Sequence, residues 1–183
     1  MTADRPFHET EINGLKRKLP LFSVAPDVQI AVFNLLGDTE AVEASARGLS
    51  ERISAASVDA LVTAEGKSVP LVYELARQMS KPWVVLRKAY KAYMGEVVSA
   101  ETHSLTTGAL QTLYLDEKDR HLVERRNVLV VDDVVSTGST VEGMLDLLAK
   151  VNANVVGVAA VFTEGDEPNP DVIALGHLPL FRT

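Results

Sequence analysis

Two adjacent carboxylates, Asp132 and Asp133, come shortly before a segment of hydroxyl and glycine residues, Ser-Thr-Gly-Ser-Thr at 136–140. Carboxylates accept hydrogen bonds from hydroxyl groups and attract hydrated cations. A loop of donors that opens a helix binds anions, because the first N–H groups of a helix are unpaired and the helix dipole favours negative charge there. A sugar phosphate with free vicinal hydroxyls satisfies both halves of this pattern.

The residues around this pattern predict a strand before it and a helix after it. The run 128–131 is apolar and rich in β-branched residues without alternation, which is typical of a strand buried on both faces of a parallel sheet. Beyond the loop, apolar residues recur with helical spacing at Val141, Met144, Leu145 and Leu148. Open α/β sheets bind ligands beyond the carboxyl ends of their strands, which is where the two acids fall.

In this context the stretch 127–140 resembles the 5-phosphoribosyl 1-diphosphate (PRPP) motif of type I phosphoribosyltransferases. The resemblance implies that Asp132 and Asp133 hold the ribose 2′ and 3′ hydroxyls and steady the positive anomeric centre, while the following loop wraps the 5′-phosphate. The residues that it implies for PRPP binding are Asp132, Asp133, Val135, Ser136, Thr137, Gly138, Ser139 and Thr140.

Two other interpretations of the stretch compete with this one. A strand ending in Val-Asp-Asp also begins response-regulator receiver domains, but only 50 residues follow Asp133, too few for the rest of such a fold. A plain buried strand followed by a capped helix is the other interpretation, and it needs no paired acids.

A second loop, Glu65, Gly66, Lys67 and Ser68, lies between a predicted strand at 58–63 and a predicted helix at 69–78. It is not a P-loop, because that motif requires a glycine at position 61, where Leu61 stands. A glycine and a cation before a helix still predict an anion site. In the family the corresponding loop binds the diphosphate, and the resemblance adds Arg87 and Lys88, which end the strand predicted at 82–86. The alternative is a turn whose lysine is merely solvated.

The segment 89–102 corresponds to a flexible loop that closes over PRPP in the family. Closure would exclude water from an oxocarbenium-like transition state, and Lys91 and the neighbouring tyrosines would supply charge and cover. An ordinary exposed basic loop is the alternative. Adenine enzymes carry an acid–tyrosine pair where Thr106 and Thr107 stand here, whereas xanthine-type enzymes and PRPP-binding purine repressors have polar, non-acidic residues there.

The resemblance implies a small hood over the active site that recognises the base, formed here by residues 1–36, with a short helix over 9–17 and a strand over 28–36. A solvated leader segment is the alternative for residues 1–20. Adenine- and xanthine-type relatives usually carry an acid where Ala31 stands, and the adenine type often has a basic residue at the place of Ile30. A carboxylate at Glu164 would accept a hydrogen bond from an exocyclic amino group, which favours adenine; a plain surface position is the alternative. The base-contacting residues predicted on this basis are Gln29, Ile30, Phe33 and Glu164.

The other elements follow from caps and periodicity. Asp38 is predicted to cap a helix over 41–53, and 102–115 to form a hairpin that turns at 106–108. A charged surface connection is expected at 116–126, a strand at 155–162, and a closing strand at 177–181.

The composition is ordinary for a globular protein of one domain, with 183 residues, 46% hydrophobic and 23% charged. A net charge of −7 gives no indication of a nucleic-acid or membrane partner. Cysteine is absent, which excludes disulfides and thiolate metal sites. The four histidines show no metal-ligand spacing and are interpreted as structural. Without a signal peptide or a long apolar span in the sequence, a cytoplasmic protein is the expectation.

These observations predict a doubly wound α/β domain with a mostly parallel sheet, as residues 37–183, and an N-terminal arm and hood, as residues 1–36. The resemblance implies a purine phosphoribosyltransferase of purine salvage that converts PRPP and a base to a nucleoside monophosphate and pyrophosphate with Mg²⁺, adenine being favoured. It assigns Asp132, Asp133 and Lys91 to catalysis, Mg²⁺ to the PRPP with possible water-mediated contact to the two acids, and a homodimer to the assembly. A xanthine or other-base enzyme and a non-catalytic PRPP-sensing regulator are the alternatives.

Overall fold

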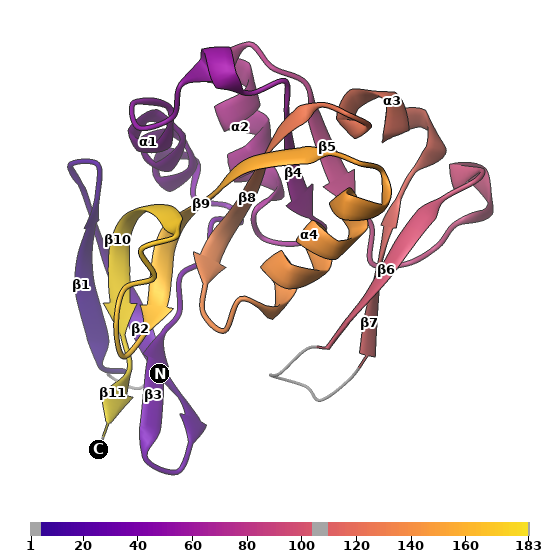
Figure 1. Cartoon of the computed structure of the whole chain (residues 1–183). Coiled ribbons are helices and arrows are strands. Elements are labelled where there is room, and N and C mark those ends of the chain that lie inside the picture. The colour runs from indigo at the N-terminus through magenta and orange to yellow at the C-terminus, as the bar shows by residue number, and fades with distance from the viewer. Residues whose placement is uncertain (1–4, 104–109, 183) are drawn as a thin grey trace.

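The computed structural model describes residues 5–103 and 110–182 (Figure 1). Its strands are β1 (Phe7–Ile12), β2 (Leu15–Ala25), β3 (Val28–Ala31), β4 (Ala60–Ala64), β5 (Trp83–Leu86), β6 (Val98–His103), β7 (Leu110–Leu115), β8 (Asn127–Val135), β9 (Asn154–Gly165), β10 (Val172–Pro179) and β11 (Phe181–Arg182). Its α-helices are α1 (Thr39–Ser50), α2 (Val69–Met79), α3 (Arg120–Val123) and α4 (Ser139–Lys150), and 3₁₀ turns lie at Ala55–Ser57, Ala92–Met94 and Glu117–Asp119.

The central sheet has the strand order β10-β9-β8-β4-β5, and every neighbouring pair in it is parallel. The predicted doubly wound α/β fold is therefore confirmed. Every residue of β4 and residues 128–131 of β8 are buried, as expected for strands that are covered on both faces. Because all five strands run the same way, their carboxyl ends meet at one edge of the sheet (Figure 1).

Helices cover both faces of this sheet. On one face α1 and α2 pack against Leu61, Leu129 and Val161. On the other face α4, together with the β6–β7 hairpin, packs against Val62 and Val130. Neighbouring residues of one strand thus enter opposite cores, which explains why β4 and β8 show no alternation of apolar and polar residues.

The helix predicted over 9–17 is wrong, because these residues form the β1–β2 hairpin. The turn is Asn13-Gly14, with φ of 47° and 86°, the two positive values that a type I′ hairpin turn requires. Asn-Gly between alternating residues is a strong hairpin signal in the sequence. The predicted hood strand is also shorter, since β3 ends at Ala31.

The N-terminal residues build a second, antiparallel sheet with the order β1-β2-β3-β11. Its last strand comes from the carboxyl end of the chain, where Phe181 pairs with Gln29. The hood therefore contains both the N-terminal segment and residues 181–182, and it lies beside β10 of the central sheet (Figure 1).

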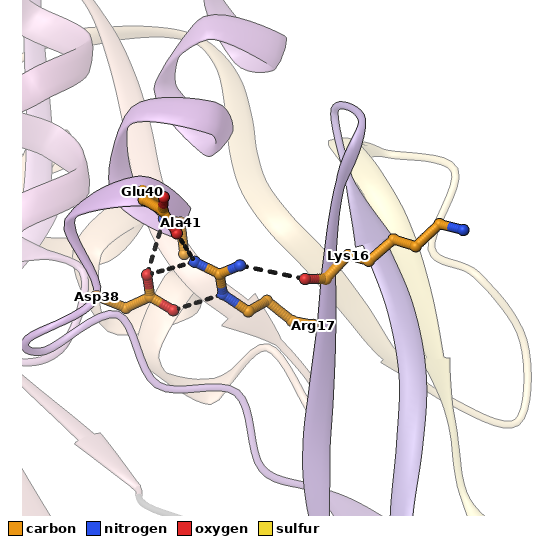
Figure 2. A network of polar contacts seen from close by, with 5 residues as sticks. All are labelled: Lys16, Arg17, Asp38, Glu40 and Ala41. Carbon is orange, nitrogen blue, oxygen red and sulfur yellow. Dashed lines mark hydrogen bonds and ion pairs between the residues drawn. The ribbon is translucent and has the colours of Figure 1, made fainter.

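A cluster of polar contacts fastens this second sheet to α1 (Figure 2). Arg17 of β2 donates from Nε and Nη2 to the two carboxylate oxygens of Asp38, at 2.8 and 2.9 Å, and from Nη2 to Glu40 at 2.8 Å. Asp38 also caps α1 as predicted, accepting from the Ala41 N–H at 3.1 Å. The Asp38 carboxylate thus caps the helix and binds the β1–β2 hairpin through Arg17. The hydrogen bonds from Arg17 lower the pKa of Asp38.

β6 and β7 pair as the predicted hairpin, although the turn proposed at 106–108 lies outside the described residues. The hairpin packs closely on α4 at Gly143, where an added Cβ would lie 2.6 Å from Thr102 Cβ. The connection 116–126 contains a 3₁₀ turn and α3 rather than an irregular turn alone. Within the described ranges, the helices are too short or too polar to cross a membrane.

Candidate functional site

A cleft of about 400 Å³ opens where the carboxyl ends of β4, β8 and β9 meet the hood. The residues that line it are Ile30, Ala31, Val32, Phe33, Ala64, Glu65, Gly66, Lys67, Ser68, Lys88, Asp132, Asp133, Val134, Ser136, Thr140 and Glu164. Acids from β8 and β9 thus face lysines from the β4–α2 loop and the end of β5, with apolar hood residues to one side. The placement agrees with the rule for ligands of open α/β sheets.

Asp132 and Asp133 both reach this cleft from β8. Asp132 Oδ1 accepts a hydrogen bond from the Asp133 N–H at 2.9 Å. Burial raises the pKa of Asp132 well above its ordinary value, the negative charge of Asp133 raises it further, and Lys88 offsets part of the effect. Two carboxylates held in this way favour a ligand that brings hydroxyl donors or positive charge.

A smaller hollow of about 140 Å³ adjoins the acids along residues 134–141. Gly138 has a φ of 83° and stands directly before α4, and its lack of a side chain leaves the first N–H groups of the helix without a side-chain cap. The loop is braced from outside, because Thr102 Oγ1 donates to the Ser139 carbonyl at 2.7 Å. The hollow has the donors and the helix N-terminus that a phosphate group requires.

The β4–α2 loop brings its own cations and hydroxyls to the cleft. Lys67 lines the cleft, and Lys88 Nζ lies 3.9 Å from the point where a Cβ on Gly66 would stand. The buried Ser68 hydroxyl is 2.7 Å from Thr63 Oγ1, which fixes the start of α2. Lys67 and Lys88 together provide positive charge that would suit a diphosphate.

Glu65 is the one acid among the four loop residues 65–68, and a carboxylate repels a diphosphate. Its oxygens accept from the Lys88 N–H at 2.9 Å and from Arg87 Nε at 3.1 Å. The Lys88 N–H is the main cause that lowers the pKa of Glu65, and the charge of Arg87 adds to it. These bonds tie the β4–α2 loop to the end of β5.

The apolar end of the cleft is formed by residues 30–33 and by Glu164 at the end of β9. Phe33 is buried and meets Phe162 edge-to-face at 5.0 Å, so the floor of this end belongs to the core. Burial raises the pKa of Glu164, while Ser136, His177 and Lys67 lower it. Apolar residues together with one carboxyl group suit a heterocyclic base.

The residues that line the cleft or the adjoining smaller hollow include most of those predicted for the site, but Gln29, Arg87 and Lys91 are not among them. Gln29 donates weakly to Ser23 on the hood at 3.4 Å. Arg87 donates a hydrogen bond to Glu65 and does not line the cleft. Lys91 is exposed and directly precedes the turn 92–94. Val135 borders the phosphate hollow but is buried. Thr106 and Thr107 lie outside the described residues.

Two features near the cleft were not predicted. His177 touches the end of β9 beside Glu164, although the sequence indicated only a structural histidine. Thr102 supports the phosphate loop from another element. Neither residue has a local sequence signal, because each contacts the site across more than ten positions.

Fold and site together define a doubly wound α/β protein with a cleft, lined by acids and lysines, at the carboxyl ends of its strands. Residues 34–174 match the model of the phosphoribosyl transferase domain, and the chain belongs to this family. Over 173 residues it is 31% identical to adenine phosphoribosyltransferase of Crocosphaera subtropica, covering 90% of this chain and 98% of that one.

Other relatives carry different names. The chain is 28% identical over 138 residues to the purine biosynthesis transcriptional repressor PurR of Bacillus subtilis, covering 75% of this chain and 48% of that one. It spans about half the length of this relative and of several others that it matches. Adenine phosphoribosyltransferase of Thermoanaerobacter pseudethanolicus has the same fold, with a TM-score of 0.66 at 20% identity over 94% of this chain and 95% of that one.

Proposed function

We propose that this protein is a purine phosphoribosyltransferase, which transfers the 5-phosphoribosyl group of PRPP to a purine base in purine salvage. The single observation that carries the proposal is one cleft that combines the acids Asp132 and Asp133, the phosphate hollow, and the lysines 67 and 88. PRPP presents vicinal hydroxyls, a 5′-phosphate and a diphosphate, and each of the three groups finds its complement there.

The reaction breaks the bond between ribose C1 and the diphosphate oxygen and forms a bond from C1 to a base nitrogen, whose proton is released. Asp132 and Asp133 orient the ribose hydroxyls and stabilise the positive charge that develops at C1. Residues 136–140 anchor the 5′-phosphate, and Lys67 and Lys88 stabilise the departing diphosphate. Catalysis on this account comes from positioning and electrostatics, and we assign no general base.

Mg²⁺ fits this donor set. Burial and mutual repulsion of Asp132 and Asp133 leave a carboxyl pair that a divalent cation would neutralise. In residues 5–103 and 110–182, no cluster of three or more His, Asp or Glu side chains is placed to hold a metal. When bound, Mg²⁺ would neutralise charge on the diphosphate of PRPP, with contact to the two acids through water.

The remaining assignments rest on the family resemblance. Lys91, which stands outside the cleft, belongs on this proposal to a segment that covers the bound substrate and excludes water. Arg87 and Glu65 hold the diphosphate loop in place. Localisation in the cytoplasm and a homodimer complete the proposal, and sedimentation of the purified protein tests the dimer.

Adenine is the base we propose. Glu164 places a carboxyl group at the apolar end of the cleft, formed with Ile30 and Phe33, and an ionised carboxylate accepts hydrogen bonds only. The exocyclic amino group of adenine is a donor, whereas the corresponding keto oxygen of hypoxanthine, guanine and xanthine is an acceptor. The relative from Crocosphaera subtropica carries the name of an adenine enzyme, which supports the same choice.

A PRPP-binding regulator is the second candidate. It is favoured by the similarity to PurR of Bacillus subtilis and by Thr106 and Thr107 in place of the acid–tyrosine pair of adenine enzymes. Such a protein would use the same cleft for PRPP without turnover.

Pyrophosphate release with Mg²⁺ and PRPP, measured against adenine, hypoxanthine, guanine, xanthine, orotate and uracil, tests the proposal. We expect turnover with adenine and its loss in Asp132→Asn/Asp133→Asn. Asp146→Asn, an exposed acid of α4, is the matched control and should retain activity. Calorimetric PRPP binding without turnover of any base would favour the regulator, and absence of PRPP binding would refute both functions.

A further inference from the structure

His177 of β10 contacts both chain neighbours of Glu164. Its Nδ1 lies 2.9 Å from Thr163 Oγ1, and its Nε2 lies 3.2 Å from the Gly165 carbonyl oxygen. His177 is paired with Thr163 in the register of β10 and β9, so the ring bridges two adjacent strands at the point where they leave the sheet. Thr163 is 1% exposed, so its hydroxyl depends on protein partners.

The partners define the proton positions on the ring. The Gly165 carbonyl can only accept, and therefore Nε2 carries the hydrogen of that bond. In the neutral ring Nδ1 is then an acceptor, and the Thr163 hydroxyl donates to it. Both ring nitrogens are occupied, which fixes the orientation of the imidazole against the end of β9.

The end of β9 depends on this support because it extends beyond its pairing with β8. Pairing of β9 with β8 ends at Thr163 and Val135, whereas pairing with β10 continues to Gly165 and Pro179. Glu164 therefore lies on a stretch that β10 alone supports. The open side is the side of the cleft, where Glu164 is a lining residue.

The same carboxyl-terminal segment continues into the hood. β11 follows β10 directly and pairs with β3, and Arg182 donates from Nη2 to both oxygens of Asp166 at 2.8 Å. Residues 177–182 thus join the strand end that bears Glu164 to the hood strand that bears Ile30. The two walls of the apolar end of the cleft share one support.

We propose that His177 is a positioning residue for the base, which holds the Glu164 carboxyl group in the cleft by fixing the backbone on both sides of it. This inference rests on the proposed transferase function and deepens it. Among the residues that the structure describes, His177 hydrogen-bonds to Thr163 and Gly165 and not to the residues proposed for ribose and phosphate, so its loss should weaken the use of the base selectively.

Steady-state kinetics with the base and PRPP varied in turn tests the proposal. In His177→Leu both hydrogen bonds are lost, and we expect the KM for adenine to rise about tenfold while the KM for PRPP stays within about twofold. His177→Gln keeps a donor and an acceptor and should recover part of the loss. His121→Leu, on the exposed face of α3, is the matched control and should behave as wild type.

A double-mutant cycle with Thr163→Val separates this role from general damage. Because Thr163 acts through the histidine, His177→Leu/Thr163→Val should be no worse for adenine than His177→Leu alone. An unchanged KM for adenine, or equal rises for adenine and PRPP, would overturn the proposal. Where His177→Leu does not fold, Thr163→Val decides by the same criterion. If the wild type turns over none of the bases, the proposed function and this inference are both refuted. If the wild type is active and the variants have an unchanged KM for adenine, only this inference is refuted.

Discussion

Glu65 Oε1 accepts a hydrogen bond from Arg87 Nε at 3.1 Å, which joins the β4–α2 loop to the end of β5. The other carboxylate oxygen, Glu65 Oε2, accepts a hydrogen bond from the Lys88 N–H, so both oxygens of the carboxylate have partners within the protein. These contacts explain why the proposed diphosphate site contains an acid. It serves as a brace that keeps Lys67 and Lys88 on the same side of the cleft.

The first prediction follows from this brace. Glu65→Gln removes the negative charge that attracts Arg87 and weakens the acceptor of the Lys88 N–H, so the loop should loosen. Because the pair is partly exposed, we expect only about a threefold rise in the KM for PRPP with little change in the KM for the base. A fall in the PRPP KM would instead mean that the acid repels bound diphosphate. Arg120→Gln, whose partner Glu124 lies on the surface, is a control for loss of an ion-pair member.

A second prediction concerns stability and the acids of β8. The pKa of Asp132 is raised in the folded protein by burial and by Asp133, so the folded state binds this proton more tightly than the unfolded chain. Stability therefore falls as pH rises from the unfolded pKa through the folded one, and the penalty is fully present above the folded pKa. Asp132→Asn should raise Tm by a few degrees at pH 8 and leave it nearly unchanged near pH 4.

Thermal unfolding of the ligand-free protein at the two pH values measures this effect, and PRPP binding should be lost in the same variant. Asp146→Asn on the exposed face of α4 provides the control, with no pH-dependent gain expected. A lower Tm for Asp132→Asn at pH 8 would show that the native carboxylate is stabilising and would contradict the argument.

The third prediction uses the close contact of α4 with β6. An added Cβ at Gly143 would stand 2.6 Å from Thr102 Cβ and 2.9 Å from its Cγ2, and Thr102 holds the Ser139 carbonyl of the phosphate loop. Gly143→Ala should therefore destabilise the protein by about 1–3 kcal/mol, although alanine favours helix, and should raise the KM for PRPP.

Thr102→Ser in the same chain removes the methyl group and keeps the hydroxyl, so it should recover part of both losses. Gly157→Ala is a suitable control, because its added Cβ would meet side chains at 3.5 and 3.6 Å, an ordinary contact distance. Urea unfolding and PRPP kinetics measure the two effects. Equal losses in the single and double variants would argue against the steric explanation.

A fourth prediction concerns Asp38, which both caps α1 and forms an ion pair with Arg17. Asp38→Ala removes the cap of α1 and the partner of Arg17 together, and we expect a loss of about 1 kcal/mol or more in the free energy of unfolding. Asp38→Asn keeps a capping oxygen and should lose less. Glu40→Gln changes a more exposed acid that contacts the same arginine and should have the smallest effect. Urea denaturation ranks the three variants, and an equal loss in all three would contradict the separate capping role.

Local patterns in the sequence predict the central sheet and the strand, loop and helix that carry the contiguous candidate site residues. The apolar run before Asp132, the donors at 136–140 and the cap at Asp38 each act over a few residues, and the structure has the strand, the loop and the helix that they predict. The glycine and cation of the β4–α2 loop were interpretable for the same reason.

Contacts between segments that are distant in the sequence cannot be predicted from such local patterns. The helix predicted over 9–17 is wrong because Asn13-Gly14 forms a hairpin turn there, whereas the pairing of β11 with β3 has no local signal at all. The family resemblance assigns Arg87 to the diphosphate, and only the structure reveals that its Nε donates to Glu65. His177 likewise acquires its place from the register of β10 with β9.

The last prediction concerns the choice of base. Glu164 is half-buried and lines the same cleft as the hood residues 30–33, and an ionised carboxylate there accepts a hydrogen bond from a 6-amino group but repels a 6-keto oxygen. Glu164→Gln offers both a donor and an acceptor and should narrow the preference for adenine over hypoxanthine, while Glu164→Lys should reverse it by about tenfold or more in kcat/KM. Glu167→Lys, in the exposed turn that follows β9, controls for added positive charge. If the preference among bases is the same in Glu164→Lys and the wild type, the carboxyl group does not select the base, and the selection must come from the hood residues 30–33.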